Sequence, residues 1–332
     1  MEEMPQSLAE RVWLAPMSGS TDAAFRRQAV RFGAEAVVSE MVAGETLAVA
    51  RPDVVRRTCR HEGRGRWIVQ LAARRPDDMR RGAELLAESG VDQIDINMGC
   101  PSRQVTGGQS GSALMKEPDL AKAIIDAALE GAHGLPVSLK MRLGWDDEML
   151  NAPELGQYAQ AAGLCMVAVH GRTRCQFYKG TANWRRVHDT VDAIDLPVIV
   201  NGDIDDCETA DAALEQSGAH GVMIGRAAMG RPWLLGQVSA HLAERDDWQE
   251  PNEAEKLDSL VEQIEDSMAL YGKTLGLRIV RKHISAAVDH LNGNWSLDVR
   301  RELRARACGF DEPMPLYAFL NELFADSAQV AA

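Results

Sequence analysis

Eight short apolar runs alternate with segments of helical periodicity over residues 12 to 238. The runs are rich in β-branched residues and begin near positions 12, 35, 67, 92, 136, 166, 197 and 221; the helical segments include 22–32, 76–89, 119–129, 154–162, 184–191, 206–215 and 227–238. A strand followed by a helix, repeated, predicts parallel strands joined by right-handed crossovers. Eight such units have the size of a (β/α)8 barrel, or TIM barrel, and a doubly wound open sheet is the alternative.

The pattern changes after His241. Residues 244–255 are strongly acidic and contain Pro251, as expected of a linker. Beyond them, apolar side chains recur at three- and four-residue intervals, which predicts about four helices packed as a bundle. We therefore expect two domains in this α/β chain of 332 residues, a TIM barrel over 1–245 and a small all-helical bundle over 246–332.

The six cysteines, at positions 59, 100, 165, 175, 207 and 308, are scattered without a Cys-x-x-Cys pair or a Cys/His ligand spacing. Neither a disulfide framework nor a metal site is indicated. The first residues are acidic and lack the apolar segment of a signal peptide, and no apolar stretch has the length of a membrane span. We expect a cytoplasmic protein that does not bind membranes.

A TIM barrel carries its active site at the carboxyl ends of its strands. The residues that follow the eight runs are Ala15 to Met17, Ser39 to Met41, Gln70, Asn97 to Cys100, Lys140 to Arg142, His170 to Arg172, Asn201 to Asp203, and Gly225 with Arg226. Each polar residue alone could be structural. So many polar and charged groups around one mouth are poorly explained by stability and indicate an active site.

Cys100 stands out in this ring. The apolar segment 91–96 stops abruptly at Asn97, Met98, Gly99, Cys100 and Pro101, so a thiol lies just past a strand end. This run and the next begin 44 residues apart, whereas most of the other consecutive runs begin 23 to 32 residues apart. Gly107 and Gly108 in the extra length could serve as a hinge for loop closure, or could simply be loop residues.

Two members of the ring suggest a phosphate site. Asn201-Gly202-Asp203 follows the seventh run and Gly225-Arg226 follows the eighth, where barrels often bind phosphate through backbone N–H groups and a helix N-terminus. Lys140 and His170 could place a positive charge and a hydrogen-bond donor against an electron-rich ring. Gln70 and Asn97 could bind the edge of that ring. This set suits a phosphorylated flavin.

Charge is unevenly distributed along the chain. The net charge is −13, yet residues 273–309 contain eight bases and three acids, a local balance of +5. Taken alone, a solvated charged face is the simpler interpretation of this basic segment, ahead of RNA binding.

Motifs along nearly the whole chain resemble those of bacterial tRNA-dihydrouridine synthases. They are APMSGSTDAAFR at 15–26, SEM at 39–41, DINMGCPSRQV at 95–105, GSAL at 111–114, LKMRLGW at 139–145, HGRTR at 170–174, VNGDI at 200–204 and MIGRAAMGRPW at 223–233. NMGCP with its Gly-rich loop is specific, whereas HGRT and NGD are weak individually. The segment YGKTLGLRIVRKH at 271–283 is similar to the B-type branch of the family.

The resemblance implies an FMN enzyme that uses NADPH to reduce the C5–C6 double bond of a uridine in tRNA. It implies flavin N5 as the hydride donor to C6, and Cys100 as the catalytic proton donor to C5. A cysteine thiol, mostly protonated at neutral pH, suits a general acid. The family's cofactor-binding positions match Pro16, Met17, Gln70, Asn97, Lys140, His170, Asn201, Gly202, Asp203, Gly225 and Arg226, with Asn97 also between flavin and uracil.

The uracil must leave the RNA stack to reach such a site. With tRNA as the partner, basic residues near the mouth and on the predicted bundle become candidate contacts, namely Arg103, Arg142, Arg172, Arg174, Arg278, Arg281 and Lys282, with Lys179 and Arg231 nearby. The bundle would then be a tRNA-binding domain. No stable protein partner is implied, and we expect a monomer.

Two other classes of function remain open at this stage. A flavin-dependent barrel that acts on a small molecule, such as a dihydroorotate dehydrogenase, would share the phosphate site and Lys140 but would not need basic helices after the barrel. A barrel that only binds RNA would be indifferent to the loss of Cys100. The use of free uridine or of tRNA as substrate, and the effect of Cys100→Ala, separate these classes.

Overall fold

The computed structural model describes residues 10–47, 49, 51–102, 110–293 and 295–331. Eight parallel strands form a closed barrel, because β2 pairs with both β1 and β4. They are β1 (Val12–Leu14), β2 (Ala36–Val38), β4 (Arg66–Ala72), β5 (Gln93–Met98), β6 (Val137–Arg142), β7 (Met166–His170), β8 (Val198–Asn201) and β9 (Gly221–Ile224), with the two-residue β3 (Val42–Ala43) added beside β4. The predicted TIM barrel is confirmed, and the open sheet is wrong.

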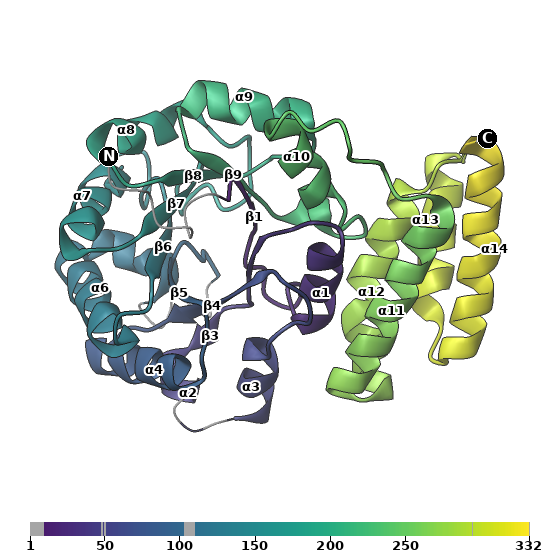
Figure 1. Ribbon diagram of the computed structural model, residues 1–332, viewed down its shortest axis with the longest axis horizontal. Helices are drawn as coiled ribbons and strands as arrows, with labels where there is room; N and C mark the ends of the chain where they lie inside the picture. The colour runs from purple at the N-terminus through teal and green to yellow at the C-terminus, as the bar shows by residue number, and fades with distance from the viewer. Residues whose placement is uncertain (1–9, 48, 50, 103–109, 294, 332) are drawn as a thin grey trace.

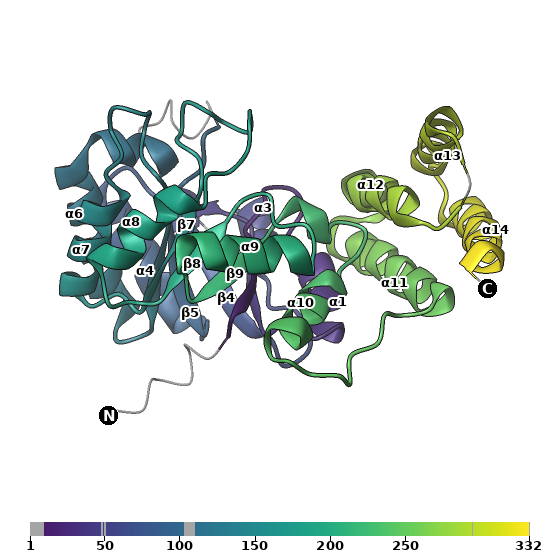
Figure 2. The same cartoon turned by 90° about the horizontal axis from the view of Figure 1, so that it is seen from above.

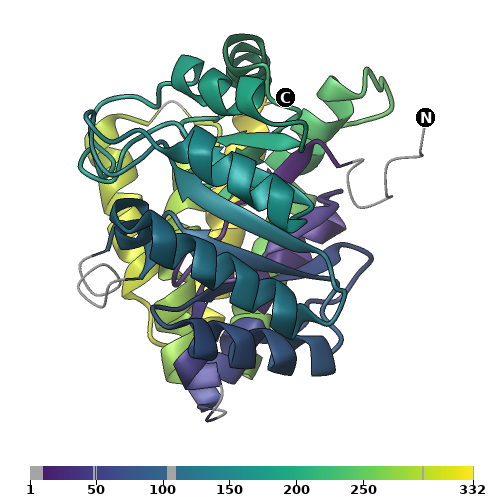
Figure 3. The same ribbon diagram turned by 90° about the vertical axis from the view of Figure 1, so that its left-hand side faces the viewer.

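Helices surround the barrel, and Figure 3 shows several of them lying across the outside of the sheet. They are α1 (Ala23–Arg31), α2 (Gly44–Leu47), α3 (Pro52–Thr58), α4 (Pro76–Glu88), α6 (Pro118–Ala132), α7 (Ala152–Ala162), α8 (Arg185–Ala193), α9 (Cys207–Ser217) and α10 (Leu234–Leu242), with 3₁₀ turns η2 (Gly111–Lys116) and η3 (Arg226–Ala228). The helix expected from residue 227 begins at Leu234. Gly230 has a φ of +73°, and Pro232 cannot continue a helical hydrogen-bond pattern, so the chain turns once before α10 starts.

Strand register brings the polar strand ends together. Asn97 of β5 is paired with Lys140 of β6, and His170 of β7 is paired with Arg142 on one side and Asn201 on the other. Alternate residues of each strand face the outer helices and form the large apolar core. The inward-facing residues include an apolar set around Trp13, which closes the barrel below the polar strand ends.

In the part of the chain that the structure describes, four further helices follow the barrel and lie beside it, next to α1 and α10 (Figures 1 and 2). They are α11 (Glu253–Tyr271), α12 (Lys273–His290), α13 (Leu297–Gly309) and α14 (Pro313–Ala331). These helices have their own apolar core, built on residues such as Ile264, Ile284 and Leu320. The predicted helical region is therefore present, whereas the predicted domain boundary at residue 245 stays a prediction. No helix within the described residues is long and apolar enough to cross a membrane.

The bundle is attached to the barrel through α1 and the loop before it. Arg27 forms an ion pair with Asp266 of α11 at 2.7 Å. The ring of His283, on α12, lies 4.4 Å from the ring of Phe25, and its Nε2 lies 3.1 Å from the carbonyl oxygen of Ser20. Since Ser20 lies in the loop after β1, the bundle directly supports one wall of the barrel mouth.

Candidate active site

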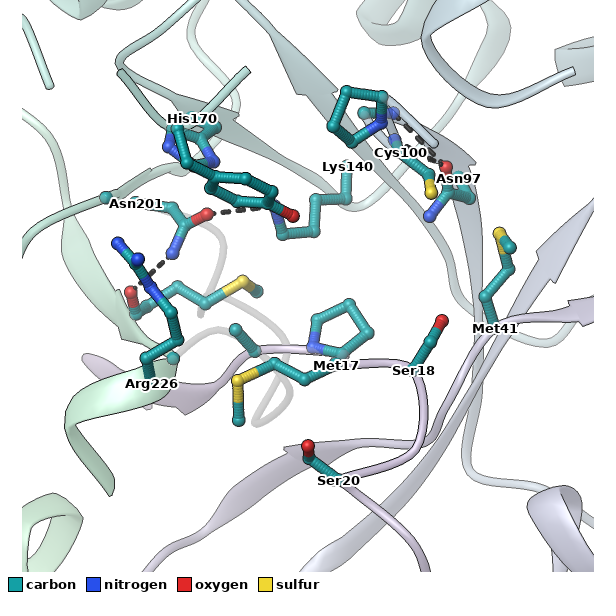
Figure 4. A pocket seen from close by; sticks show the side chains of 18 of the residues that line it. Met17, Ser18, Ser20, Met41, Asn97, Cys100, Lys140, His170, Asn201 and Arg226 are labelled. Carbon is teal, nitrogen blue, oxygen red and sulfur yellow. Dashed lines mark hydrogen bonds between the residues drawn. The ribbon is translucent and has the colours of Figure 1, made fainter. Parts of the chain in front are cut away.

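A cavity of about 1190 Å³ opens at the carboxyl ends of the strands. Thirteen of the residues predicted for the site line it: Pro16, Met17, Gln70, Asn97, Cys100, Lys140, Arg142, His170, Asn201, Gly202, Asp203, Gly225 and Arg226. Figure 4 shows the sulfur of Cys100 pointing into this cavity beside Asn97. The structure thus brings together residues from β1, β4 to β9 and the loops that follow them.

The backbone of Cys100 is held from two sides. The side-chain oxygen of Asn97 accepts hydrogen bonds from the N–H groups of Gly99 (3.2 Å) and Cys100 (3.0 Å). On the other side, the Ser112 hydroxyl donates to the Cys100 carbonyl oxygen at 2.8 Å. The Asn97 amide nitrogen in turn donates to Gln70 Oε1 at 2.6 Å. These contacts fix where the loop leaves the strand, and with it the base of the thiol side chain.

Lys140, on the strand beside that of Asn97, and Asn201 continue the cavity wall. Lys140 Nζ donates to Asn201 Oδ1 at 2.9 Å, and Asn201 Nδ2 donates to the carbonyl oxygen of Met223 at 2.7 Å. Burial, together with the neighbouring Arg142 guanidinium, lowers the pKa of Lys140 to about 8. The ammonium group is therefore mostly charged at neutral pH, but it is held in a costly environment that an anionic ligand would relieve.

His170 is uncharged. Burial and then the positive charges of Lys140 and Arg142 lower its pKa well below the ordinary value. The Nη1 of Arg172 lies 3.3 Å from His170 Nε2. Because a guanidinium can only donate, Nε2 must be the acceptor, so the neutral ring carries its proton on Nδ1. Gly202, with a φ of +111°, lies against this ring, and a Cβ there would approach the ring to 2.9 Å.

Arg142 and Arg172 were expected to contact RNA phosphates, and the structure corrects this. Their exposed fractions are 1% and 2%. Arg142 donates to the carbonyl oxygens of Gly99 (2.8 Å), Thr173 (2.8 Å) and Phe177 (2.9 Å). Arg172 binds the Asp203 carboxylate and the Gly180 carbonyl oxygen. Both guanidinium groups are thus used to hold the loops after β5, β7 and β8 rather than presented to solvent.

The remaining predicted tRNA contacts fall into four groups. Arg174 is half-buried between the rings of Trp145 (4.7 Å) and Phe177 (5.2 Å). On α12, Arg278 and Lys282 are exposed and make no ion pair with a described residue. Arg281 is paired with Asp311 at 2.9 Å. Arg103, Gly107 and Gly108 lie outside the described residues.

The basic segment is less free than its composition indicated. Four of its eight bases, Lys273, Arg281, Arg301 and Arg304, form ion pairs with carboxylates, among them Glu312 and Asp311, which lie just after the segment. Lys282 approaches the cavity, because a Cβ built on Gly19 would lie 2.9 Å from its Nζ. Gly19 lines the cavity, so a cation of α12 reaches the rim of the site.

Sequence reasoning missed Tyr178. Its ring lines the cavity yet is 54% exposed, and it lies beside the guanidinium groups of Arg142 (5.6 Å) and Arg226 (5.4 Å). The preceding Phe177 has a φ of +55°, a left-handed conformation unusual for an aromatic residue. Tyr178 stands eight residues after the end of β7 and was therefore not sought among strand-end residues. An aromatic residue in a long loop after a barrel strand was the available signal.

Comparison with known proteins gives a consistent result. The family model described as "Dihydrouridine synthase (Dus)" matches residues 13–308. A "Probable tRNA-dihydrouridine synthase" of Rhodobacter capsulatus is 45% identical over 316 residues, 95% of either chain, and one of Rickettsia conorii is 44% identical over 83% of this chain and 84% of its own. The "tRNA-dihydrouridine synthase B" of Xanthomonas axonopodis is 40% identical over 87% of both. The resemblance inferred from the motifs is confirmed, and this chain belongs to the dihydrouridine synthase family of oxidoreductases.

Proposed function

We propose that this protein is an FMN-dependent tRNA-dihydrouridine synthase that uses NADPH as reductant. One observation carries the proposal: the thiol of Cys100 faces into the same cavity as the Lys140, His170 and Asn201 side chains. At about 1190 Å³, this cavity exceeds the usual size of a single-ligand pocket and has room for a flavin and a pyrimidine together. The names of the relatives support uridine in tRNA as the substrate.

The residues present fit FMN. Lys140 supplies positive charge, and neutral His170 has an Nδ1–H donor to offer, as a ring that becomes electron-rich on reduction requires. At the far end, a Cβ on Gly225 would meet nothing closer than 3.6 Å, so bare backbone faces the cavity there. The Arg226 side chain is 61% exposed, and its contact with Asp203 is a long one at 3.4 Å, which leaves the guanidinium available to a phosphate.

When bound, FMN would supply the hydride for C6 of the uracil. The chain's own part is to deliver a proton to C5, and Cys100 is the group placed to do so. Its thiol acts here as an acid, so it needs no neighbouring base to activate it as a nucleophile. The Cys100 backbone donates a hydrogen bond to Asn97 and accepts one from Ser112, which fixes the distance from which the proton is delivered.

The mouth of the cavity suits a base lifted out of RNA. The exposed ring of Tyr178 offers a stacking surface, flanked by two guanidinium groups. Lys282 and Arg278 continue the positive charge onto α12. We accordingly assign catalysis to a barrel domain over 1–245 and tRNA binding to a helical domain over 246–332, acting as a monomer in the cytoplasm.

The test is reconstitution. Purified protein loaded with FMN should, with NADPH and an unmodified tRNA transcript, form dihydrouridine detectable by nucleoside mass spectrometry, and free uridine should be a poor substrate. Cys100→Ala should retain flavin and tRNA binding but lose turnover. Equal reduction of free uridine would favour a small-molecule enzyme, and turnover unaffected by Cys100→Ala would remove the thiol from the mechanism.

A further inference from the structure

A buried carboxylate lies inside the barrel beneath the active site and has no role in the reaction proposed above. Asp95 of β5 is 2% exposed and does not line the cavity. Its Oδ1 accepts a hydrogen bond from the Ser138 hydroxyl at 2.6 Å, and its Oδ2 accepts one from Gln70 Nε2 at 2.7 Å. A buried charge is costly unless it is well paired, so a strand position that retains one invites an explanation.

The hydrogen bonds on the Gln70 side continue to Cys100. Gln70 Oε1 accepts from Asn97 Nδ2 at 2.6 Å, and Asn97 Oδ1 accepts from the N–H of Cys100 at 3.0 Å. Burial raises the pKa of the Asp95 carboxyl, while the hydrogen bonds from Ser138 and Gln70 and the charge of Lys140 oppose the rise. In its ionised form the carboxyl only accepts, and a backbone N–H only donates, so both ends of this chain are then fixed. Between such ends each amide has one orientation, with its nitrogen toward Asp95 and its oxygen toward Cys100.

The Ser138 side is fixed as well. The Ser138 oxygen accepts from Gln93 Nε2 at 2.7 Å, and Gln93 Oε1 accepts from the Arg66 guanidinium, which can only donate. The hydroxyl hydrogen of Ser138 must therefore point to Asp95. Donors reach the carboxylate from both directions, so Asp95 is the acceptor that sets the polarity of the whole network.

We propose that Asp95 is a positioning residue for Cys100, acting through the amides of Gln70 and Asn97. The proposal rests on the role assigned above to Cys100 in the reaction. It does not place Asp95 in contact with substrate or cofactor. Its function is to keep the Asn97 oxygen, rather than the Asn97 nitrogen, against the N–H of Cys100, and so to hold the proton donor in place.

The substitution Asp95→Asn tests the relay, that is, the chain of hydrogen bonds from Asp95 through Gln70 and Asn97 to Cys100, with almost no change in the shape of the side chain. The new amide has an N–H₂ group that must face either Ser138 or Gln70. Ser138 is 1% exposed, so its displaced hydrogen is shielded from bulk water, whereas Asn97 borders the cavity, where water can pair a mismatched donor. The mismatch therefore moves to the end of the chain that borders the cavity: Gln70 and Asn97 turn over, and the Asn97 nitrogen meets the N–H groups of both Gly99 and Cys100.

The double substitution Asp95→Asn with Gln70→Glu should repair this. The carboxylate is then at position 70, where it accepts from the new amide at position 95 and from Asn97 Nδ2. Asn97 regains its orientation and every donor has an acceptor. Ser138→Ala is the matched control, because it removes a hydrogen bond to the same carboxylate without allowing the Gln70 and Asn97 amides to invert.

The measurements are kcat and KM for tRNA and the rate of Cys100 alkylation by iodoacetamide, followed by peptide mass spectrometry. We expect Asp95→Asn to lower kcat about 10- to 100-fold, with KM nearly unchanged, and to change the alkylation rate. Because Gln70 itself lines the proposed flavin site, the double variant should restore the alkylation rate of Cys100 rather than kcat. Ser138→Ala should keep both kcat and the alkylation rate close to wild type. A kcat and alkylation rate for Asp95→Asn within about twofold of wild type would overturn the proposal. So would a folded double variant whose alkylation rate is no closer to wild type than that of the single variant.

Two further outcomes are distinguishable. If Asp95→Asn does not fold, a folded double variant with the wild-type alkylation rate supports the relay, and a double variant that also fails to fold or that alkylates differently contradicts it. If wild-type protein makes no dihydrouridine, the proposed function fails, yet the alkylation rates still decide whether Asp95 sets the place of Cys100.

Discussion

Replacing Lys140 with methionine should make the flavin-free protein more stable at neutral pH while abolishing most turnover. Burial lowers the pKa of Lys140 from 10.5 to about 8. Each pKa unit corresponds to about 1.4 kcal/mol, so holding the charged ammonium in the folded protein costs about 3 kcal/mol. Methionine has nearly the same length and removes this cost.

The sign of the pH dependence follows from the direction of this shift. Between about pH 8 and pH 10.5 the unfolded chain still binds a proton at Lys140 that the folded protein has released. Unfolding then takes up a proton, so the free energy of unfolding of the wild type rises with pH across this window. The stability advantage of Lys140→Met is therefore largest below pH 8 and shrinks by about 2.5 kcal/mol by pH 10.

Urea denaturation of both flavin-free proteins from pH 7 to pH 10 measures this difference. Methionine also leaves Asn201 Oδ1 without its hydrogen-bond donor. That cost does not depend on pH, so it changes the stability difference between the two proteins by the same amount at every pH. Lys116→Met, at an exposed lysine, is the control and should show no such trend. A gap between wild type and Lys140→Met that stays constant within about 0.5 kcal/mol over this range would refute the reasoning.

Two further predictions concern the RNA. Tyr178→Ala should lower kcat/KM for tRNA by an amount equivalent to about 1–3 kcal/mol, because a stacking surface is lost. Tyr178→Phe keeps the ring and should behave like wild type. Equal losses of kcat/KM in the two variants would contradict stacking. Replacing Arg278, Arg281 and Lys282 with glutamine should weaken tRNA binding in a salt-dependent way while flavin content stays unchanged, and Arg281 should contribute least because it is paired with Asp311. Filter binding at several salt concentrations checks this, and an unchanged salt slope would exclude these side chains from the RNA contact.

The sequence predicted the barrel because its signal is local and repeated. Each of the eight apolar runs became a barrel strand, since strands buried on both faces need continuous apolar residues. The site was predictable for the same reason, because strand ends of a closed barrel must converge. β3 was missed because two residues have no measurable periodicity, and the start of α10 was misplaced because Gly230 and Pro232 were not weighed as helix breakers.

The predicted directions of two long side chains, those of Arg142 and Arg172, were wrong. Arg142 lies two residues after Lys140 on the same strand, so the two-residue period already places both on the inner face. The same period puts Asp95 on the face of Asn97, between Ile94 and Ile96, and could have revealed the buried carboxylate. Arg172 follows the end of its strand, and no local pattern predicts that it would bind Asp203, thirty-one residues later, rather than solvent.

The contact of His283 with the loop after β1 limits how this protein can be re-engineered. A bundle transplanted from a relative to change which RNA is chosen would have to bring its own donor for the Ser20 carbonyl oxygen and its own ring for Phe25. Without them, the swap would loosen the residues beside Met17 and alter the chemistry along with the specificity. Chimeras that keep the whole of α12 from the host, and with it His283, should therefore succeed more often than those cut at the acidic linker.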